Sequence, residues 1–170
     1  MPRLHVCSLS LVSETVAQTG ARSLITLLSP GTPIERPAQI VPERHLYLAI
    51  SDIVAPMPGQ TMPEREHLDD LIAFIRAWDR AEPMLIHCFA GVSRSTAAAF
   101  IAACALSPHR DEFGIARALR AASPTASPNA RLVALADGAL ARGGRMTEAI
   151  AQIGRGDECF EGTPFTLELN

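Results

Sequence analysis

The strongest constraint on the fold is a strand, a loop and a helix that follow one another directly between residues 84 and 105. The apolar run 84–86 suits a buried strand and leads straight to Cys88. Residues 93–105 are apolar around nearly the whole helical circumference, so this helix has to be buried on all sides. A strand that turns directly into a buried helix predicts a sheet with helices packed on it.

Strands and helices alternate along the chain. Compact apolar runs predict further strands, and apolar residues spaced three and four apart predict amphipathic helices. The expected strands are 5–9, 23–28, 45–50 and 84–87, and the expected helices are 12–19, 64–81, 93–105, 111–122, 129–140 and one that ends near 153. This alternation predicts an α/β fold with a central sheet of four to five strands flanked by helices. Residues 1–153 are expected to form this single domain.

Residues 154–170 are expected to form a C-terminal arm. Phe165 to Leu169 alternate like a strand, and Phe160 adds apolar surface, which argues against a disordered tail. We expect the arm to cover the core of its own domain, with packing on a partner chain as the alternative. Cys159 lies on this arm, but nothing in the sequence brings it to Cys88, so a redox pair of the two is disfavoured.

The loop between strand and helix has the residues expected to bind an anion. The first N–H groups of a helix lack carbonyl partners, and the helix dipole adds partial positive charge. That field favours the thiolate of Cys88, which is the nucleophilic form of cysteine. Arg94 adds a planar guanidinium that matches two phosphate oxygens. Ser95 follows it and is placed to hydrogen-bond the thiolate sulfur.

A second cysteine with an arginine at the same spacing provides an internal comparison. Cys104 precedes Arg110, but no apolar strand leads to it, and Ser107 and Pro108 interrupt the segment where a helix would have to start. We therefore expect Cys104 to be a buried helical thiol without a catalytic role.

The motif His87-Cys88, two residues, Gly91, two residues, Arg94-Ser95 resembles the phosphate-binding loop of the cysteine-dependent protein tyrosine phosphatase superfamily. The resemblance is to the compact, dual-specificity-like type, for which we expect a bacterial source. It implies a phosphatase-type fold, hydrolysis through a phosphocysteine, and phosphate binding by the loop residues Phe89, Ala90, Gly91, Val92 and Ser93. It also implies that His87 supports the loop, although a core histidine with satisfied hydrogen bonds explains that residue equally well.

Hydrolysis of a phosphomonoester also needs an acid for the departing oxygen. Asp52 ends the strand 45–50, opens a proline-rich loop, and precedes Cys88 at a spacing similar to that of the acid in compact dual-specificity phosphatases. The alternative for Asp52 is a loop-capping role. Glu64 is a weaker candidate for the acid, because it is better placed to start a helix.

Asn129 follows Pro128, and this pair resembles the start of the helix after the phosphate loop in dual-specificity enzymes. In that position Asn129 would brace the loop or a water molecule. A plain helix N-cap explains the residue equally well.

The amino-acid composition argues against several classes of function. The net charge is −3, the pI is near 5.9 and the chain has no lysine, which argues against a nucleic-acid partner. Its four cysteines are scattered, so we expect neither a metal site nor a disulfide framework, no cofactor, and reduced thiols in a cytoplasm. No apolar run approaches the length of a membrane span, and the run 4–12 is too interrupted for a signal peptide.

These features predict a phosphatase that acts on phosphotyrosine, another phosphoprotein or a small phosphomonoester. Phosphate, sulfate or vanadate should bind in the loop. The alternative is a catalytically silent phosphate- or phosphoprotein-binding module. An inositol-lipid phosphatase is disfavoured because the loop interior has no lysine or arginine. An RNA triphosphatase is disfavoured because the chain is acidic. A rhodanese-like transferase is disfavoured because it would not need Arg94 and Ser95 in this arrangement.

Overall fold

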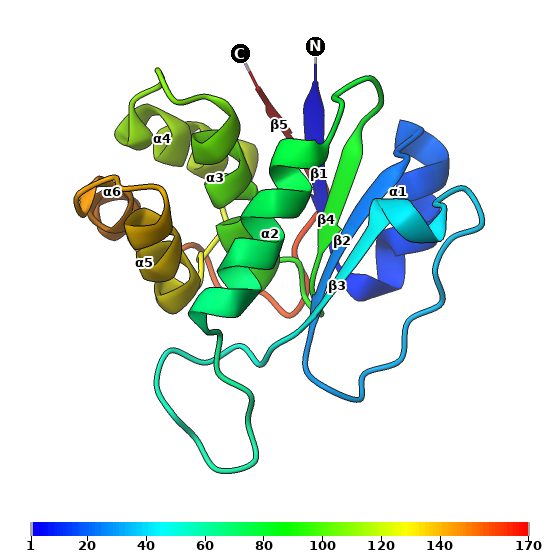
Figure 1. Ribbon diagram of the computed structural model, residues 1–170, viewed down its shortest axis with the longest axis horizontal. Coiled ribbons are helices and arrows are strands. Elements are labelled where there is room, and N and C mark those ends of the chain that lie inside the picture. The colour runs from blue at the N-terminus through cyan, green and yellow to red at the C-terminus, as the bar shows by residue number, and fades with distance from the viewer. Residues whose placement is uncertain (1, 170) are drawn as a thin grey trace.

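The computed structural model describes residues 2–169 and contains a five-stranded mixed sheet with the strand order β3-β2-β4-β1-β5 (Figure 1). The strands are β1 (Arg3–Cys7), β2 (Ser23–Leu28), β3 (His45–Ala49), β4 (Met84–His87) and β5 (Phe165–Glu168). The first four strands run parallel, whereas β5 is antiparallel to β1. The predicted α/β class with four to five strands is confirmed.

Helices cover both faces of the sheet. One face carries α1 (Val12–Thr19), and the other carries α2 (Arg65–Ala77), α3 (Arg94–Leu106), α4 (Glu112–Ala122), α5 (Ala130–Ala139) and α6 (Arg145–Ile153) (Figure 1). Two short 3-10 turns, η1 (Leu9–Leu11) and η2 (Pro42–Arg44), lead into α1 and β3. Among residues 2–169, no helix has both the length and the apolar character needed to cross a lipid bilayer.

Two predicted boundaries are wrong. The first strand covers Arg3–Cys7 and not 5–9, because the chain leaves the sheet at Ser8 and turns into η1. The helix expected over 64–81 ends at Ala77, because Trp78 leaves the helix and its indole N–H donates to the Glu82 carbonyl (3.0 Å). The other elements begin and end within about two residues of their predicted positions, which is the usual uncertainty of helix ends.

The helix α3 is the centre of the fold. Every residue of α3 except Ala105 is buried, as its apolar circumference predicted. It contacts strands of the sheet on one side and α2, α4 and α5 on the others. Its many alanines let these neighbours approach closely, so the N-terminus of α3 is held on a rigid element.

The C-terminal arm adds the edge strand of the sheet. The strand β5 pairs with β1 over Val6 to Arg3, and Leu167 and Leu169 are buried. Before β5, the arm passes the carboxyl ends of β1 and β4 at the lower end of the sheet in Figure 1. The residues between α6 and β5 therefore lie beside the loop that follows β4.

A chain of buried hydrogen bonds connects three strands on the α1 face. The Thr26 hydroxyl lies 2.8 Å from Nε2 of His45 and 2.8 Å from Nε2 of His87. Nδ1 of His87 lies 3.0 Å from the Cys88 carbonyl oxygen, which can only accept, so Nδ1 carries the proton. Nε2 of His87 then accepts from Thr26, and His45 donates to the Thr26 oxygen. The Cys88 carbonyl is thereby fixed from inside the sheet.

This chain makes folding stability depend on pH. Burial, together with the positive neighbours His45 and Arg94, lowers the pKa of His87 from 6.5 to about 4, although the Cys88 carbonyl opposes the shift. A depressed pKa means that neutral His87 stabilises the folded state above pH 6.5 and that this stability is lost as the pH falls towards 4. The loss amounts to roughly 3 kcal/mol.

Denaturant unfolding between pH 7.5 and 4 measures this contribution. The His87→Gln variant should be less stable than wild type at pH 7.5, and the difference should shrink towards pH 4. The exposed His109 provides the control, because His109→Gln should keep the wild-type profile. Parallel profiles for wild type and His87→Gln would show that protonation of His87 is not linked to folding and would contradict its lowered pKa.

Candidate functional site

The loop from Cys88 to Ser93 lies between the carboxyl end of β4 and the N-terminus of α3. Cys88 is only 2% exposed and packs in the cluster beneath α3, whereas the preceding His87 faces the other side of the sheet. The Cys88 sulfur lies 3.1 Å from the Ser95 hydroxyl and accepts from the Gly91 N–H at 3.3 Å. The structure therefore brings together the predicted nucleophile and the predicted hydroxyl.

Donors outside the loop hold the loop carbonyls. The Cys88 carbonyl accepts a hydrogen bond from the His87 ring (3.0 Å), and the Phe89 carbonyl accepts one from the Leu9 N–H (3.1 Å). The Ala90 carbonyl accepts from the Gly162 N–H (2.8 Å), and the Val92 carbonyl accepts from the Ser127 N–H (2.9 Å). The Ser93 carbonyl accepts from the N–H groups of Ala97 (3.0 Å) and Asn129 (3.2 Å). In a planar trans peptide the N–H points opposite to the carbonyl. The amides that follow these carbonyls therefore point into the loop, where they form a cradle for an anion.

Gly91 is required by this arrangement. Its φ is +72°, a region that other residues rarely adopt. A Cβ at this position would also lie 2.9 Å from the Cys7 carbonyl carbon and 2.9 Å from the Ser8 nitrogen. The loop therefore packs against the end of β1 with its bare backbone.

Arg94 lies at the first position of α3 and is 7% exposed. Its Nη1 donates to the Ile50 carbonyl (2.9 Å) and to the Ser29 hydroxyl (3.4 Å). Its Nε is buried and has no hydrogen-bond partner among residues 2–169. The contacts of Nη1 fix the guanidinium and leave the Nε–Nη2 edge able to donate to two oxygens of one anion.

Asp52 lies at the edge of the loop, as its position at a strand end predicted. Its Oδ1 accepts from the Ser93 hydroxyl (2.7 Å) and from Nδ2 of Asn129 (2.8 Å). The peptide N–H of Ser51 donates to the Thr61 carbonyl (2.8 Å), and the Thr61 N–H donates to the Ser51 hydroxyl (3.1 Å), which closes the base of the long loop before α2. Asp52 is thus fixed at the base of that loop while its side chain remains exposed.

The Asn129 side chain caps α5, as one of the two predicted alternatives has it, and it also contacts the segment that carries Asp52. Its Oδ1 accepts from the Leu132 N–H (3.0 Å) and caps α5, while its Nδ2 donates to Asp52 and to the Ile53 carbonyl (3.3 Å). Glu64 has a different role, because its side chain forms a capping box with His67 at the start of α2 and pairs with Arg131 (3.0 Å).

The remaining cysteines differ from Cys88 in position. Burial raises the pKa of Cys104 to about 12, and the thiol lies within α3, remote from its N-terminus. Burial likewise raises the pKa of Cys7 to about 12, and its side chain packs on the α1 face. Cys159 is exposed and lines a cavity that also borders the loop. All four thiols are free.

That cavity, of about 620 Å³, opens beside the loop between Cys88 and Ser93. Asp52, Val92 and Ser93 line one side of it, and the arm residues Arg155, Asp157 and Cys159 line the other. That the arm reaches this cavity could not be predicted from the sequence. The arm and loop also meet directly through Gly162 and Ala90.

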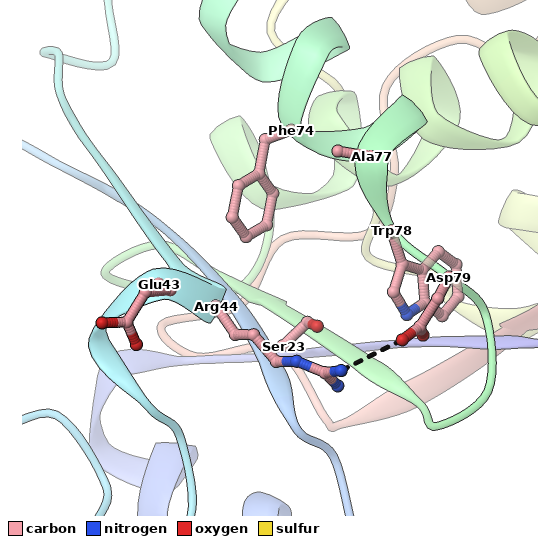
Figure 2. A pocket seen from close by; sticks show the side chains of 7 residues that line it. All are labelled: Ser23, Glu43, Arg44, Phe74, Ala77, Trp78 and Asp79. Atoms are coloured by element: carbon pink, nitrogen blue, oxygen red, sulfur yellow. Dashed lines mark hydrogen bonds and ion pairs between the residues drawn. The ribbon is translucent and has the colours of Figure 1, made fainter.

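A separate hollow lies at the opposite edge of the sheet, where β2 and β3 begin (Figure 2). Ser23, Arg44 and Trp78 are among its lining residues. Arg44 is paired there with Asp79 (3.0 Å) and Glu82 (3.4 Å), so its charge is already compensated. This hollow contains none of the predicted site residues. Within residues 2–169, no group of three His, Cys, Asp or Glu side chains is arranged to hold a metal ion.

Part of the chain, with the loop inside it, matches a known family model. Residues 57–126 match the family model described as protein-tyrosine phosphatase. No curated protein sequence matches the chain.

Several solved structures share the fold. A mouse putative dual specificity phosphatase complexed with zinc tungstate has 21% identity and a TM-score of 0.62, over 86% of each chain. Human DUSP28 has 21% identity and a TM-score of 0.59, over 79% of this chain and 86% of that chain. A human tyrosine phosphatase-like serine/threonine/tyrosine-interacting protein has 20% identity and a TM-score of 0.61, over 84% of this chain and 93% of that chain. These structures show that the chain shares their fold, and the family match covers residues 57–126, which include the loop.

Proposed function

We propose that this protein is a phosphatase that hydrolyses phosphomonoesters through a phosphocysteine at Cys88. The observation that carries the proposal is the cradle of inward-pointing amides around the Cys88 sulfur, next to the unpaired Nε of Arg94. A buried donor without a partner costs about 1–3 kcal/mol, and an oxyanion in the cradle would satisfy it. The family match over residues 57–126 supports the same activity.

In the first step the Cys88 thiolate attacks phosphorus, so that a P–S bond forms while the P–O bond to the leaving group breaks. The loop amides and Arg94 stabilise the three equatorial oxygens as their charge redistributes. The Oδ1 atom of Asp52 is engaged by Ser93 and Asn129, which leaves Oδ2 to give a proton to the departing oxygen.

In the second step water attacks the phosphocysteine and the P–S bond breaks. Asp52, now ionised, accepts a proton from that water. The Ser95 hydroxyl, 3.1 Å from the sulfur, donates to the thiolate that leaves. The cycle returns Cys88 as a thiolate, Asp52 as an acid, and releases inorganic phosphate.

The substrate that we propose is phosphotyrosine or another phosphoprotein residue, or a small phosphomonoester. The cavity of about 620 Å³ beside the loop can accept a group larger than phosphate. Phe89, 57% exposed, offers an apolar surface in a second cavity, which it lines together with Ala90 and Phe160. We further propose that the protein is of the compact, dual-specificity-like bacterial type and has a cytoplasmic location, where the four free thiols would stay reduced.

Release of phosphate from an aryl phosphate tests the activity, since a silent phosphate-binding module would bind oxyanions and release no phosphate.

Substitution of the two cysteines separates the nucleophile from the comparison site. Cys88→Ser should abolish turnover, because a serine hydroxyl is almost wholly protonated at neutral pH, yet vanadate should still protect the variant from thermal unfolding. Cys104→Ser should keep turnover within a few fold of wild type. Steady-state kinetics and melting curves with vanadate measure both effects. The opposite pattern would place the active site elsewhere.

The acid role of Asp52 predicts a dependence on the leaving group. A positioned acid contributes about 10² to 10⁴ in rate when the departing oxygen is basic, and much less when it is a stable anion. Asp52→Asn should therefore lower kcat strongly with phenyl phosphate and weakly with nitrophenyl phosphate. The same fold loss across a series of aryl phosphates would assign Asp52 to loop structure alone.

A further inference from the structure

We propose that the C-terminal arm positions the phosphate-binding loop, and that Gly162 is the positioning residue. The inference rests on the proposed phosphatase function and adds a part of the chain that lies outside the loop and outside the matched family region. Its carrying observation is the hydrogen bond from the Gly162 N–H to the Ala90 carbonyl, at 2.8 Å.

This bond sets the orientation of one peptide unit of the loop. The Ala90 carbonyl and the Gly91 N–H belong to the same planar peptide and point in opposite directions. With the carbonyl held by the arm, the Gly91 N–H points to the Cys88 sulfur, 3.3 Å away. The same N–H is placed to donate to an equatorial oxygen as the phosphoryl group reaches the sulfur. The arm therefore orients a donor to the reacting atoms without touching them.

Three segments of backbone pack closely at this point. Gly91 lies directly against the end of β1, where a Cβ would be 2.9 Å from the Ser8 nitrogen. Gly162 also lies against the loop backbone, since a Cβ at Gly162 would be 2.9 Å from the Gly91 carbonyl oxygen and 3.4 Å from the Ala90 carbonyl oxygen. The glycine in the arm allows the arm to reach the loop. A larger residue at Gly162 would push the two apart.

The arm is anchored on both sides of Gly162. On one side, Glu161 accepts hydrogen bonds from the hydroxyls of Ser8 and Ser10, which hold the arm to the segment that follows β1. On the other side, β5 pairs with β1. Earlier in the arm, the Asp157 N–H donates to the Pro124 carbonyl (2.9 Å). These contacts fix the arm independently of its bond to Ala90, so the arm can hold the Ala90 peptide in one orientation.

The substitution Gly162→Ala tests the proposal. The new methyl group should displace the arm from Ala90, so kcat/KM for an aryl phosphate should fall about 10- to 100-fold, since complete loss of one such donor costs 10² to 10³ in kcat. The inhibition constant of vanadate should rise in parallel. Thr163→Ala is the matched control, because Thr163 is exposed and lies next to Gly162 in the arm.

A second variant tests whether a loss of activity in Gly162→Ala comes only from a loss of folded protein. Glu161→Ala removes the anchor and keeps the backbone of the arm, so it should shift kcat/KM and vanadate affinity in the same direction by a smaller factor. Melting curves of all variants separate misplacement of the loop from loss of folded protein, because a merely destabilised protein has less folded material but the same vanadate affinity per folded molecule.

Wild-type vanadate affinity in Gly162→Ala would overturn the positioning role. Absence of both turnover and vanadate binding in wild type would instead overturn the proposed function.

Discussion

The structure depends on how the carbonyls of one short loop are hydrogen-bonded. A loop whose amides all point inward has to turn its carbonyls outward, and a buried carbonyl without a donor is costly. Here one donor is the ring of the adjacent His87, and the others come from distant parts of the chain: Leu9 after β1, Ser127 before α5 and Gly162 in the arm. The anion cradle is therefore a product of the whole fold, and the loop sequence alone does not produce it.

The buried helix α3 provides the fixed reference for this loop. Its N-terminal turn carries Arg94 and Ser95, and its burial between the sheet and three helices prevents either residue from shifting. Asp52 reaches the same place from another strand and is held through Ser93 and Asn129. Nucleophile, cation, hydroxyl and carboxyl thus come from elements that meet at the carboxyl edge of the parallel strands, where such sheets place their sites.

The sequence predicted those parts of the site that are local. The proximity of Cys88, Arg94 and Ser95 could be predicted because a strand, a loop and a helix follow one another in the chain. That of Asp52 could be predicted because it ends a neighbouring strand. The contacts of Gly162 with Ala90 were missed because a backbone N–H donor leaves no trace in side-chain identity. The Asn129 alternatives could not be separated because one amide side chain has both an acceptor and a donor, and here each is used. The end of α2 was not predicted because the Trp78 indole N–H donates a hydrogen bond to the Glu82 carbonyl, outside the helix.

The most direct test of the account is whether the phosphoryl group resides on Cys88 during turnover. Wild-type protein mixed with a radiolabelled aryl phosphate and stopped with denaturant within milliseconds should retain label on the protein, and peptide mapping should locate that label at Cys88 as a phosphocysteine. The amount should rise to no more than one label per chain and should decay as inorganic phosphate appears. Turnover without any protein-bound label, or label on another residue, would contradict the account.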